Sequence, residues 1–148
     1  MPQEIALIWA GLSVWLAGLG VVIGQGEMSR VSMDILGKNP HIRSQLLVFT
    51  VLWIALVESW VIYAMIISFK IINTPGLEPM HAIAGGLAMG LAGLGSGFWE
   101  SKIVVWSLEA FNRNPENKAQ VLQSMLMYLA LAEVVSIYAL IVAMQLLK

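Results

Sequence analysis

LVESWVIYAM, at residues 56–65, places Glu58 deep in an apolar run, and LAEVVSIYAL, at residues 131–140, places Glu133 in a matching run. The two glutamates are 75 positions apart, and sliding the chain by 75 positions aligns its halves without a gap. Further identities under this shift are Gly11 with Gly86, residues 16–20 with 91–95, Asn39-Pro40 with Asn114-Pro115, and residues 62–64 with 137–139. Self-similarity at a fixed period is the mark of a duplicated structural unit, so the chain consists of two tandem repeats.

The composition indicates a membrane protein. The 148 residues are 59% hydrophobic and only 11% charged, with a mean hydropathy of +0.81, whereas about 25% of residues are charged in a typical soluble domain. The net charge of −1 offers no electrostatic attraction for nucleic acid, and the lack of cysteine excludes disulfides and thiolate metal sites. Residues 1–10 carry no positively charged signal region, so we expect the beginning of a retained helix.

Four stretches are long and apolar enough to cross a bilayer, which requires about 20 residues in a helix. They run approximately over Ile5–Leu36, Leu46–Ile72, His81–Phe111 and Ala119–Leu147. The short connections contain Asn-Pro in the first and third loops, and NTPGLEP in the second. We therefore expect an all-α membrane protein with four transmembrane helices, arranged as a hairpin at 1–73, a connecting loop at 74–80 and a second hairpin at 81–148.

The basic residues predict the orientation in the membrane. Cytoplasmic loops are enriched in Lys and Arg, and such residues surround the first and third loops: Arg30, Lys38, Arg43, Lys102, Arg113 and Lys118. Loops 37–45 and 112–118 are therefore expected on the cytoplasmic side, with both termini on the opposite side.

Glycine is concentrated in the first and third helices. Gly20/Gly24, Gly86/Gly90 and Gly93/Gly97 have the GxxxG spacing, which lets helix backbones approach closely in lipid. We expect these helices to form the inner layer of an oligomeric ring, and the bulkier second and fourth helices to form the outer layer. We expect the tryptophans, at positions 9, 15, 53, 60, 99 and 106, to face lipid or the membrane interface.

Glu58 and Glu133 lie near the centres of the second and fourth helices, where an ionised acid costs roughly 2.5–3.5 kcal/mol on insertion scales. Two equivalent acids in this setting favour sites that bind and release a proton or a metal cation. Loop midpoints predict their partners: antiparallel packing about residue 41.5 brings Gln25 level with Glu58, and packing about 116.5 brings Glu100 level with Glu133.

Two tyrosines are weaker candidates for the same sites. Tyr63 and Tyr138 each follow an acid by five residues, so that their hydroxyls would be near the carboxylates, although both also suit apolar packing.

Together these residues resemble the c subunit, the rotor-ring proteolipid of rotary ATP synthases of the F or V type. The resemblance rests on the glycine-rich first helix, the GQG at 24–26, the glutamate followed by Ile-Tyr, and the basic-Asn-Pro loops at Lys38-Asn39-Pro40 and Arg113-Asn114-Pro115. It implies a ring of identical subunits in membrane lipid, each glutamate carrying H+ or Na+ past the a subunit of the stator. It further implies contact of the two loops with the central-stalk subunits gamma and epsilon, no cofactor, and no catalysis by this protein.

The identity of the ion stays open in the sequence. Sodium-coupled relatives place a glutamine, a serine, a carbonyl and a tyrosine around the glutamate. Because the family's sites lie between neighbouring hairpins, Glu100 and Glu133 are expected to meet Ser59 and the Leu56 carbonyl, an oxygen-rich set suited to Na+. Gln25 and Glu58 would instead meet Leu131 and Val134, which favours a proton. Alternatively, the two adjacent acids share one proton, since like charges resist ionising together.

Three other functions are compatible with the residues. One is a V-type ATPase proteolipid that pumps Na+ or H+. Another is a compact four-helix transporter that uses Glu58 and Glu133 for proton-coupled export, and the third is a purely structural membrane proteolipid.

Overall fold

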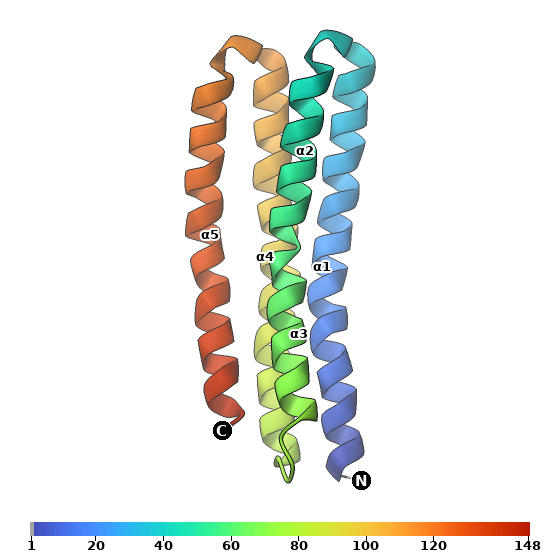
Figure 1. Cartoon of the computed structure of the whole chain (residues 1–148), viewed down its shortest axis with the longest axis vertical. Helices are drawn as coiled ribbons and strands as arrows, with labels where there is room; N and C mark the ends of the chain where they lie inside the picture. The colour runs from blue at the N-terminus through green and yellow to red at the C-terminus, as the bar shows by residue number, and fades with distance from the viewer. Residues whose placement is uncertain (1) are drawn as a thin grey trace.

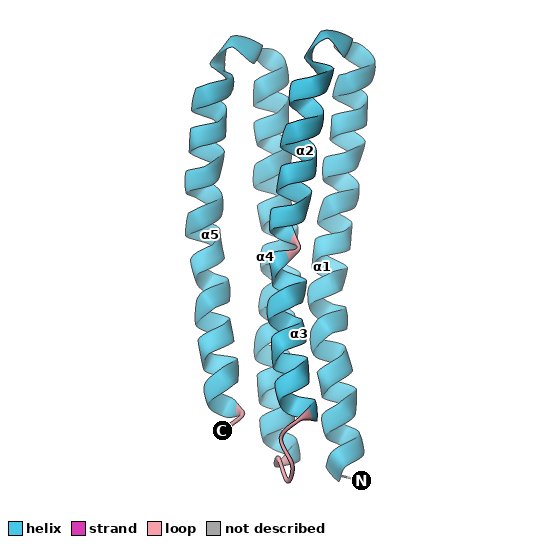
Figure 2. Cartoon of the chain, in the orientation of Figure 1, coloured by secondary structure: helices cyan, strands magenta, loops and turns pink. Residues whose placement is uncertain are grey.

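The chain is a bundle of long helices (Figure 1). The computed structural model describes residues 2–148, and within that range it contains helices and turns but no strand (Figure 2). The elements are α1 (Pro2–Lys38), η1 (Pro40–Ile42), α2 (Arg43–Val57), α3 (Ser59–Ile72), α4 (Pro79–Arg113), η2 (Pro115–Asn117) and α5 (Lys118–Leu146).

The helices form two antiparallel hairpins with the same direction. The first hairpin is α1 followed by α2 and α3, and the second is α4 followed by α5. The short 3-10 turns η1 and η2 lie together at one end, and the termini lie with the α3–α4 turn at the other (Figure 1). Each turn begins at the proline of an Asn-Pro pair, because proline disfavours helical geometry in the residue before it. The two hairpins are thus parallel repeats.

The helices suit a bilayer in length and surface. Four spans, Gln3–Lys38, Pro40–Ile72, Pro79–Arg113 and Pro115–Leu146, are long and apolar enough to cross a membrane. Large apolar side chains such as Val48, Leu131 and Ile141 are exposed along their length, as expected of surfaces solvated by lipid. The protein is therefore an integral membrane protein of four transmembrane helices.

Glycines bring α1 and α4, the inner pair, into backbone contact. A Cβ at Gly20 would strike the Leu94 carbonyl oxygen, and a Cβ at Gly86 would lie 2.9 Å from the carbonyl oxygen of Trp9. A Cβ at Gly93 would lie 2.5 Å from the Cβ of Ala17. The absence of side chains at these positions is therefore what lets the two helices pack this closely.

Helices α2, α3 and α5 lie outside this pair. Thr50 of α2 donates a hydrogen bond to Ser32 of α1 over 2.9 Å, and the ring of Phe49 stacks on that of Phe111 of α4 at a centroid distance of 5.3 Å. These contacts fix the second span over the inner pair. Helix α5 packs mainly on α4 (Figure 1), and the large side chains on its outward side are exposed.

The turn between the hairpins contains the one described residue with a left-handed backbone. Gly76 has φ 73° and follows Pro75, a sequence typical of a type II turn, which needs positive φ at its third position. Helix α4 then begins at Pro79, a position that suits proline because the first helical N–H has no partner.

One expectation about the second span is wrong, and the span has one further feature. Trp53 and Trp60 do not face lipid or the interface: both are fully buried against the other helices. The span is also not one continuous helix, because it is interrupted at Glu58 between α2 and α3 (Figure 2). The equivalent span, α5, runs unbroken through Glu133.

Candidate functional site

The first acid lies beside the amide predicted to be level with it. Gln25 Nε2 of α1 donates a hydrogen bond to Glu58 Oε1 over 3.2 Å, and lies 3.5 Å from the carbonyl oxygen of Ile54. Gln25 and Glu58 also line a shallow pocket with Gly18 and Ile62. This pair of residues is called the Glu58 site below, and it opens to the surface of the bundle through this pocket.

The same amide accounts for the interruption between α2 and α3. In a regular helix the Ile54 carbonyl would accept the N–H of residue 58, but the Glu58 N–H points to the Leu56 carbonyl instead. A side chain that inserts into the helical ladder is a recognised cause of such a break, and Gln25 supplies a donor there. The repeat-equivalent residue is Glu100, which in its ionised form has no donor to offer, and α5 stays continuous.

The second acid is held between the hairpins. Glu133 of α5 accepts a hydrogen bond from Tyr63 over 3.0 Å and a longer one from Ser59 over 3.4 Å, both on Oε1. Both donors belong to α3, in the other half of the chain. Glu133 is thus a carboxylate of the second repeat that two hydroxyl groups of the first repeat bind.

A third acid completes this group. Glu100 of α4 is only 4% exposed, and its Oε2 accepts a hydrogen bond from the indole Nε1 of Trp60 over 2.8 Å. Its other oxygen, Oε1, is buried without a hydrogen-bond partner among the described residues. Ser59, Tyr63, Glu100 and Glu133, with Trp60, are called the Glu133 site below.

Trp60 is the residue that sequence reasoning missed. A tryptophan in an apolar run suits a lipid-facing position, so the indole gave no obvious signal. A usable signal was its place directly after Ser59, next to an expected site, because a buried indole N–H generally needs an acceptor.

Other predicted residues lie apart from these contacts. Tyr138 is 63% exposed on the outer surface of α5, in contrast to its equivalent Tyr63. The Leu56 carbonyl accepts the Glu58 N–H within its own span. The two basic-Asn-Pro loops, at residues 38–40 and 113–115, lie side by side at one end of the bundle (Figure 1).

The chemistry available at the two sites differs. The Glu58 site combines one carboxylate with an amide, which suffices to hold a proton. The Glu133 site gathers two carboxylates and two hydroxyls, and oxygen ligands of this kind are those that hard cations prefer. Both sites lie within the membrane spans.

Comparison with known proteins agrees with the duplication. The family model for the C subunit of ATP synthase matches twice, over residues 8–71 and 83–146. The two matches are offset by the same 75 positions as the internal repeat.

Individual relatives match one hairpin's length. The ATP synthase c subunit of Dehalococcoides mccartyi is 37% identical over 66 residues, which cover 45% of this chain and 87% of the relative. The chloroplastic ATP synthase c subunit of Diacronema lutheri is 36% identical over 73 residues, covering 49% of this chain and 88% of the relative. The ATP synthase c subunit of Protochlamydia amoebophila is 40% identical over 70 residues, covering 47% and 71%.

About half of this chain thus spans between 71% and 88% of each of these relatives, and the family model covers both halves. The chain therefore belongs to the family of ATP synthase c subunits, as a form in which two hairpins of that family are fused in one polypeptide.

Proposed function

We propose that the protein is the ion-carrying rotor subunit of an ATP synthase, and that Glu58 and Glu133 each carry one H+ or Na+ across the membrane. The broader role, that of a non-catalytic membrane rotor subunit, follows from its family. The observation that carries the proposal is the binding of Glu133 by Tyr63 and Ser59 of the other hairpin. An acid of one repeat that is held within the membrane by hydroxyl groups of the other is expected to bind a neutralising cation.

Rotation would expose each site in turn to the stator. In this proposal the stator's a subunit loads an ion onto each carboxylate from one side of the membrane and removes it toward the other. Loops 37–45 and 112–118 face the cytoplasm and contact the central-stalk subunits gamma and epsilon, so that rotation reaches the catalytic head. The placement of both loops at one end of the bundle supports this arrangement.

The two sites are proposed to differ in ion preference. Sodium needs several oxygen ligands, and the Glu133 site has two carboxylates and two hydroxyls, with Glu100 Oε1 still unpartnered among the described residues. The Glu58 site has one carboxylate and the Gln25 amide. We therefore assign Na+ to Glu100, Glu133 and Ser59, or one proton shared by the two acids, and a proton to Glu58.

Labelling with a carbodiimide, which modifies protonated carboxyl groups, tests this assignment. The purified protein is treated across a range of pH, with NaCl or with choline chloride at the same ionic strength, and the labelled residues are identified by mass spectrometry. We expect both acids to react, and Na+ to slow the reaction at Glu133 but not at Glu58. Protection of neither acid at any pH would exclude sodium, and failure of both to react would contradict the ion-carrying role.

The duplication favours a second candidate, the proteolipid of a V-type ATPase. Proteolipids of that type resemble this chain in having four helices, but usually keep one ion-carrying acid, whereas both halves keep theirs here. A four-helix proton-coupled transporter is less compatible with the structure. Its substrate cavity would lie between the hairpins, where α1 and α4 are in backbone contact.

A further inference from the structure

Trp60 is in contact with residues on both sides of the Glu133 site. Its indole Nε1 donates a hydrogen bond to Glu100 Oε2 over 2.8 Å, and its ring meets that of Tyr63 edge-on, at a centroid distance of 6.2 Å and an interplanar angle of 76°. Tyr63 in turn donates to Glu133. One indole thus contacts Glu100 itself and the tyrosine that binds Glu133.

The indole is held firmly in its own place. Trp60 is fully buried, and a Cβ at Gly93 of α4 would lie 3.9 Å from the Trp60 Cβ, so the base of the side chain packs directly on the inner pair. Close-packed interiors leave a side chain of this size a single rotamer. The indole N–H therefore has one fixed position, from which it can orient Glu100.

Glu100 is oriented by this one hydrogen bond. Its length of 2.8 Å falls in the range of about 2.7–2.9 Å for hydrogen bonds to charged groups, which are the stronger ones. The bond engages Oε2 and leaves Oε1, which is buried and has no hydrogen-bond partner among the described residues. A buried acceptor without a partner is costly, and a bound cation would remove this cost.

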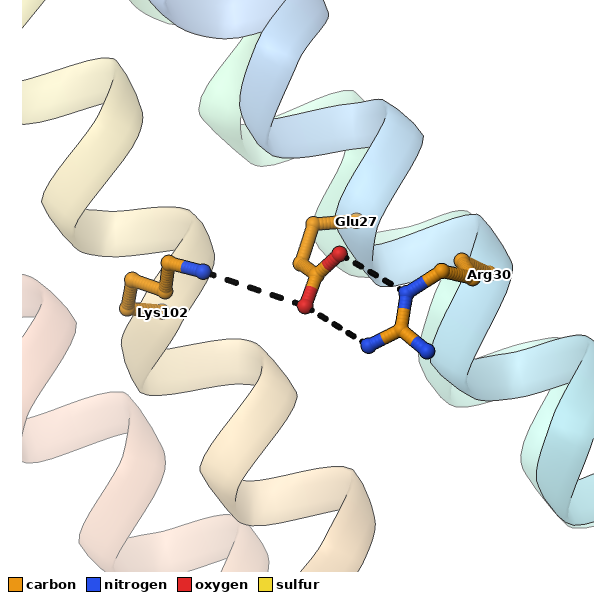
Figure 3. Close-up of polar contacts among 3 residues, drawn as sticks. All are labelled: Glu27, Arg30 and Lys102. Carbon is orange, nitrogen blue, oxygen red and sulfur yellow. Dashed lines mark hydrogen bonds and ion pairs between the residues drawn. The ribbon is translucent and has the colours of Figure 1, made fainter.

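No basic side chain among the described residues neutralises Glu100 or Glu133. Lys102 follows Glu100 by two residues in α4, but its Nζ lies 3.8 Å from Glu27 Oε1, and Arg30 binds the same carboxylate (Figure 3). The ion pairs of the described residues include neither of the two acids. The positive charge that these acids need in the membrane must therefore come from a bound ion.

We propose that Trp60 is a positioning residue for Na+ at the Glu133 site. Its N–H fixes Glu100 so that Oε1 is a ligand of the cation, and its ring keeps the Tyr63 hydroxyl on Glu133. Trp60 does not touch the cation itself. This role rests on the proposed assignment of Na+ to the site.

The role concerns Na+ rather than a proton. A proton needs one carboxylate oxygen, whereas Na+ needs several oxygen ligands, and groups that orient such ligands raise the affinity for a metal ion. The Glu58 site has no equivalent of this indole, because the repeat equivalent of Trp60 is Val135, whose side chain has no N–H. Fixing Glu100 therefore separates the ion preferences of the two sites.

The carbodiimide reaction measures this affinity when NaCl is varied at constant ionic strength and the full-length protein is intact in membranes. The measured quantity is the Na+ concentration that halves the rate of labelling at Glu133. We expect Trp60→Phe to raise this concentration by about tenfold or more, since losing a group that orients a metal ligand costs about 10–100-fold in affinity. Labelling at Glu58 of the same molecules should not change, which excludes a general loss of structure.

Trp53→Phe is the matched control. Trp53 is similarly buried in the same span, but its Nε1 has no partner among the described residues. The variant thus makes the same change in side-chain volume without removing a hydrogen bond, and should leave the half-protecting Na+ concentration at Glu133 unchanged. Trp60→Leu, which also lacks a donor, should behave as Trp60→Phe does, so that the test does not depend on the assembly of one variant.

A double-mutant cycle separates orientation from packing. Glu100→Leu removes both carboxylate oxygens while keeping a side chain of similar size, and should itself weaken the protection by Na+. In that background Trp60→Phe has no carboxylate left to release, so it should change the half-protecting concentration by less than about twofold. If Trp60 and Glu100 acted independently, their losses would instead multiply.

Three results would each overturn the positioning role: equal Na+ protection of the unaltered protein and Trp60→Phe, equal losses in Trp60→Phe and Trp53→Phe, or multiplying losses in the cycle. All three leave the ion-carrying role intact, since Glu58 and Glu133 would still react. Absence of Na+ protection at Glu133 in the unaltered protein would overturn the positioning role together with the assignment of Na+ to this site. Only failure of both acids to react contradicts the ion-carrying role itself.

Discussion

Trp60 and Val135 occupy equivalent positions in the two repeats, and this single difference gives the Glu133 site a donor that the Glu58 site lacks. The indole N–H bonds to Glu100, while Gln25, the equivalent of Glu100, is an amide that supplies its own donors. The duplicated chain has therefore diverged at two linked positions. The acid Glu100 has the Trp60 indole beside it. Its equivalent is the amide Gln25, and the equivalent of the Trp60 indole is the side chain of Val135.

Trp60→Phe should destabilise the protein through the loss of this hydrogen bond, since it keeps most of the apolar volume. It leaves Glu100 with no hydrogen-bond donor among the described residues, and an unsatisfied buried acceptor costs about 1–3 kcal/mol, more when charged. Unfolding of the detergent-solubilised protein by sodium dodecyl sulfate, followed by circular dichroism, measures the change.

Trp53→Phe is the matched control, because Trp53 is equally buried but its Nε1 has no partner among the described residues. The hydrogen bond is the cause only if Trp60→Phe is the more costly substitution. Equal losses would assign the effect to packing.

At this scale the sequence predicted that Gln25 lies level with Glu58, because antiparallel helices of known rise bring residues at equal distances from their turn to the same depth. It did not predict that Trp60 lies inside. Burial of one face of a helix depends on how the second hairpin packs, and the sequence around Trp60 is apolar on all sides.

Among the elements, the broken second span and the unbroken α5 differ most. The break at Glu58 occurs without proline or glycine nearby, so no local signal marks it. It arises from a side chain on another helix, Gln25. The residues around Glu58 therefore contain no sign of it. The long helices and their turns, in contrast, were predictable from apolar length and the Asn-Pro pairs.

The inner helices depend on glycine at particular positions, and Gly20→Ala tests this. The new Cβ would overlap the Leu94 backbone, which has no flexible end to give way. Overpacking of this kind costs about 1–3 kcal/mol, measured by the same detergent unfolding.

Gly37→Ala adds the same methyl group to α1 in open space. It should be neutral or stabilising by up to about 1 kcal/mol, since alanine favours the helix. A similar loss for both variants would mean that the contact between α1 and α4 is unimportant.

At the scale of the whole molecule, every site passes the stator under the proposed function. Pumping then requires that both Glu58 and Glu133 exchange an ion. Glu58→Gln and Glu133→Gln should each abolish ATP-driven ion pumping in reconstituted vesicles, because the amide does not exchange an ion and each copy carries one such blocked site. Retention of pumping by both variants would instead favour the purely structural proteolipid.

Glu78→Gln is the control, because Glu78 is exposed in the turn between the hairpins, away from both sites. Its pumping should match that of the unaltered protein. The duplication, which the sequence displayed directly, predicted the two hairpins of the fold. Of the contacts between hairpins, the one between Ser59 and Glu133 was expected from the sequence. The bonds from Tyr63 to Glu133 and from Trp60 to Glu100 required the structure, because a repeat gives the relation between halves in sequence and not their packing.

The turn of residues 73–78 joins α3 to α4 in one chain. It therefore also restricts the number of ions that the rotor can move in one revolution. Copies enter the assembly two carboxylates at a time, so under the proposed function the number of ions moved per full revolution is always even. A gain or loss of one copy changes the transmission ratio between ion flow and ATP by two ions per revolution. A rotor of fused chains can therefore have fewer different ratios of ions moved to ATP than a rotor built from single hairpins.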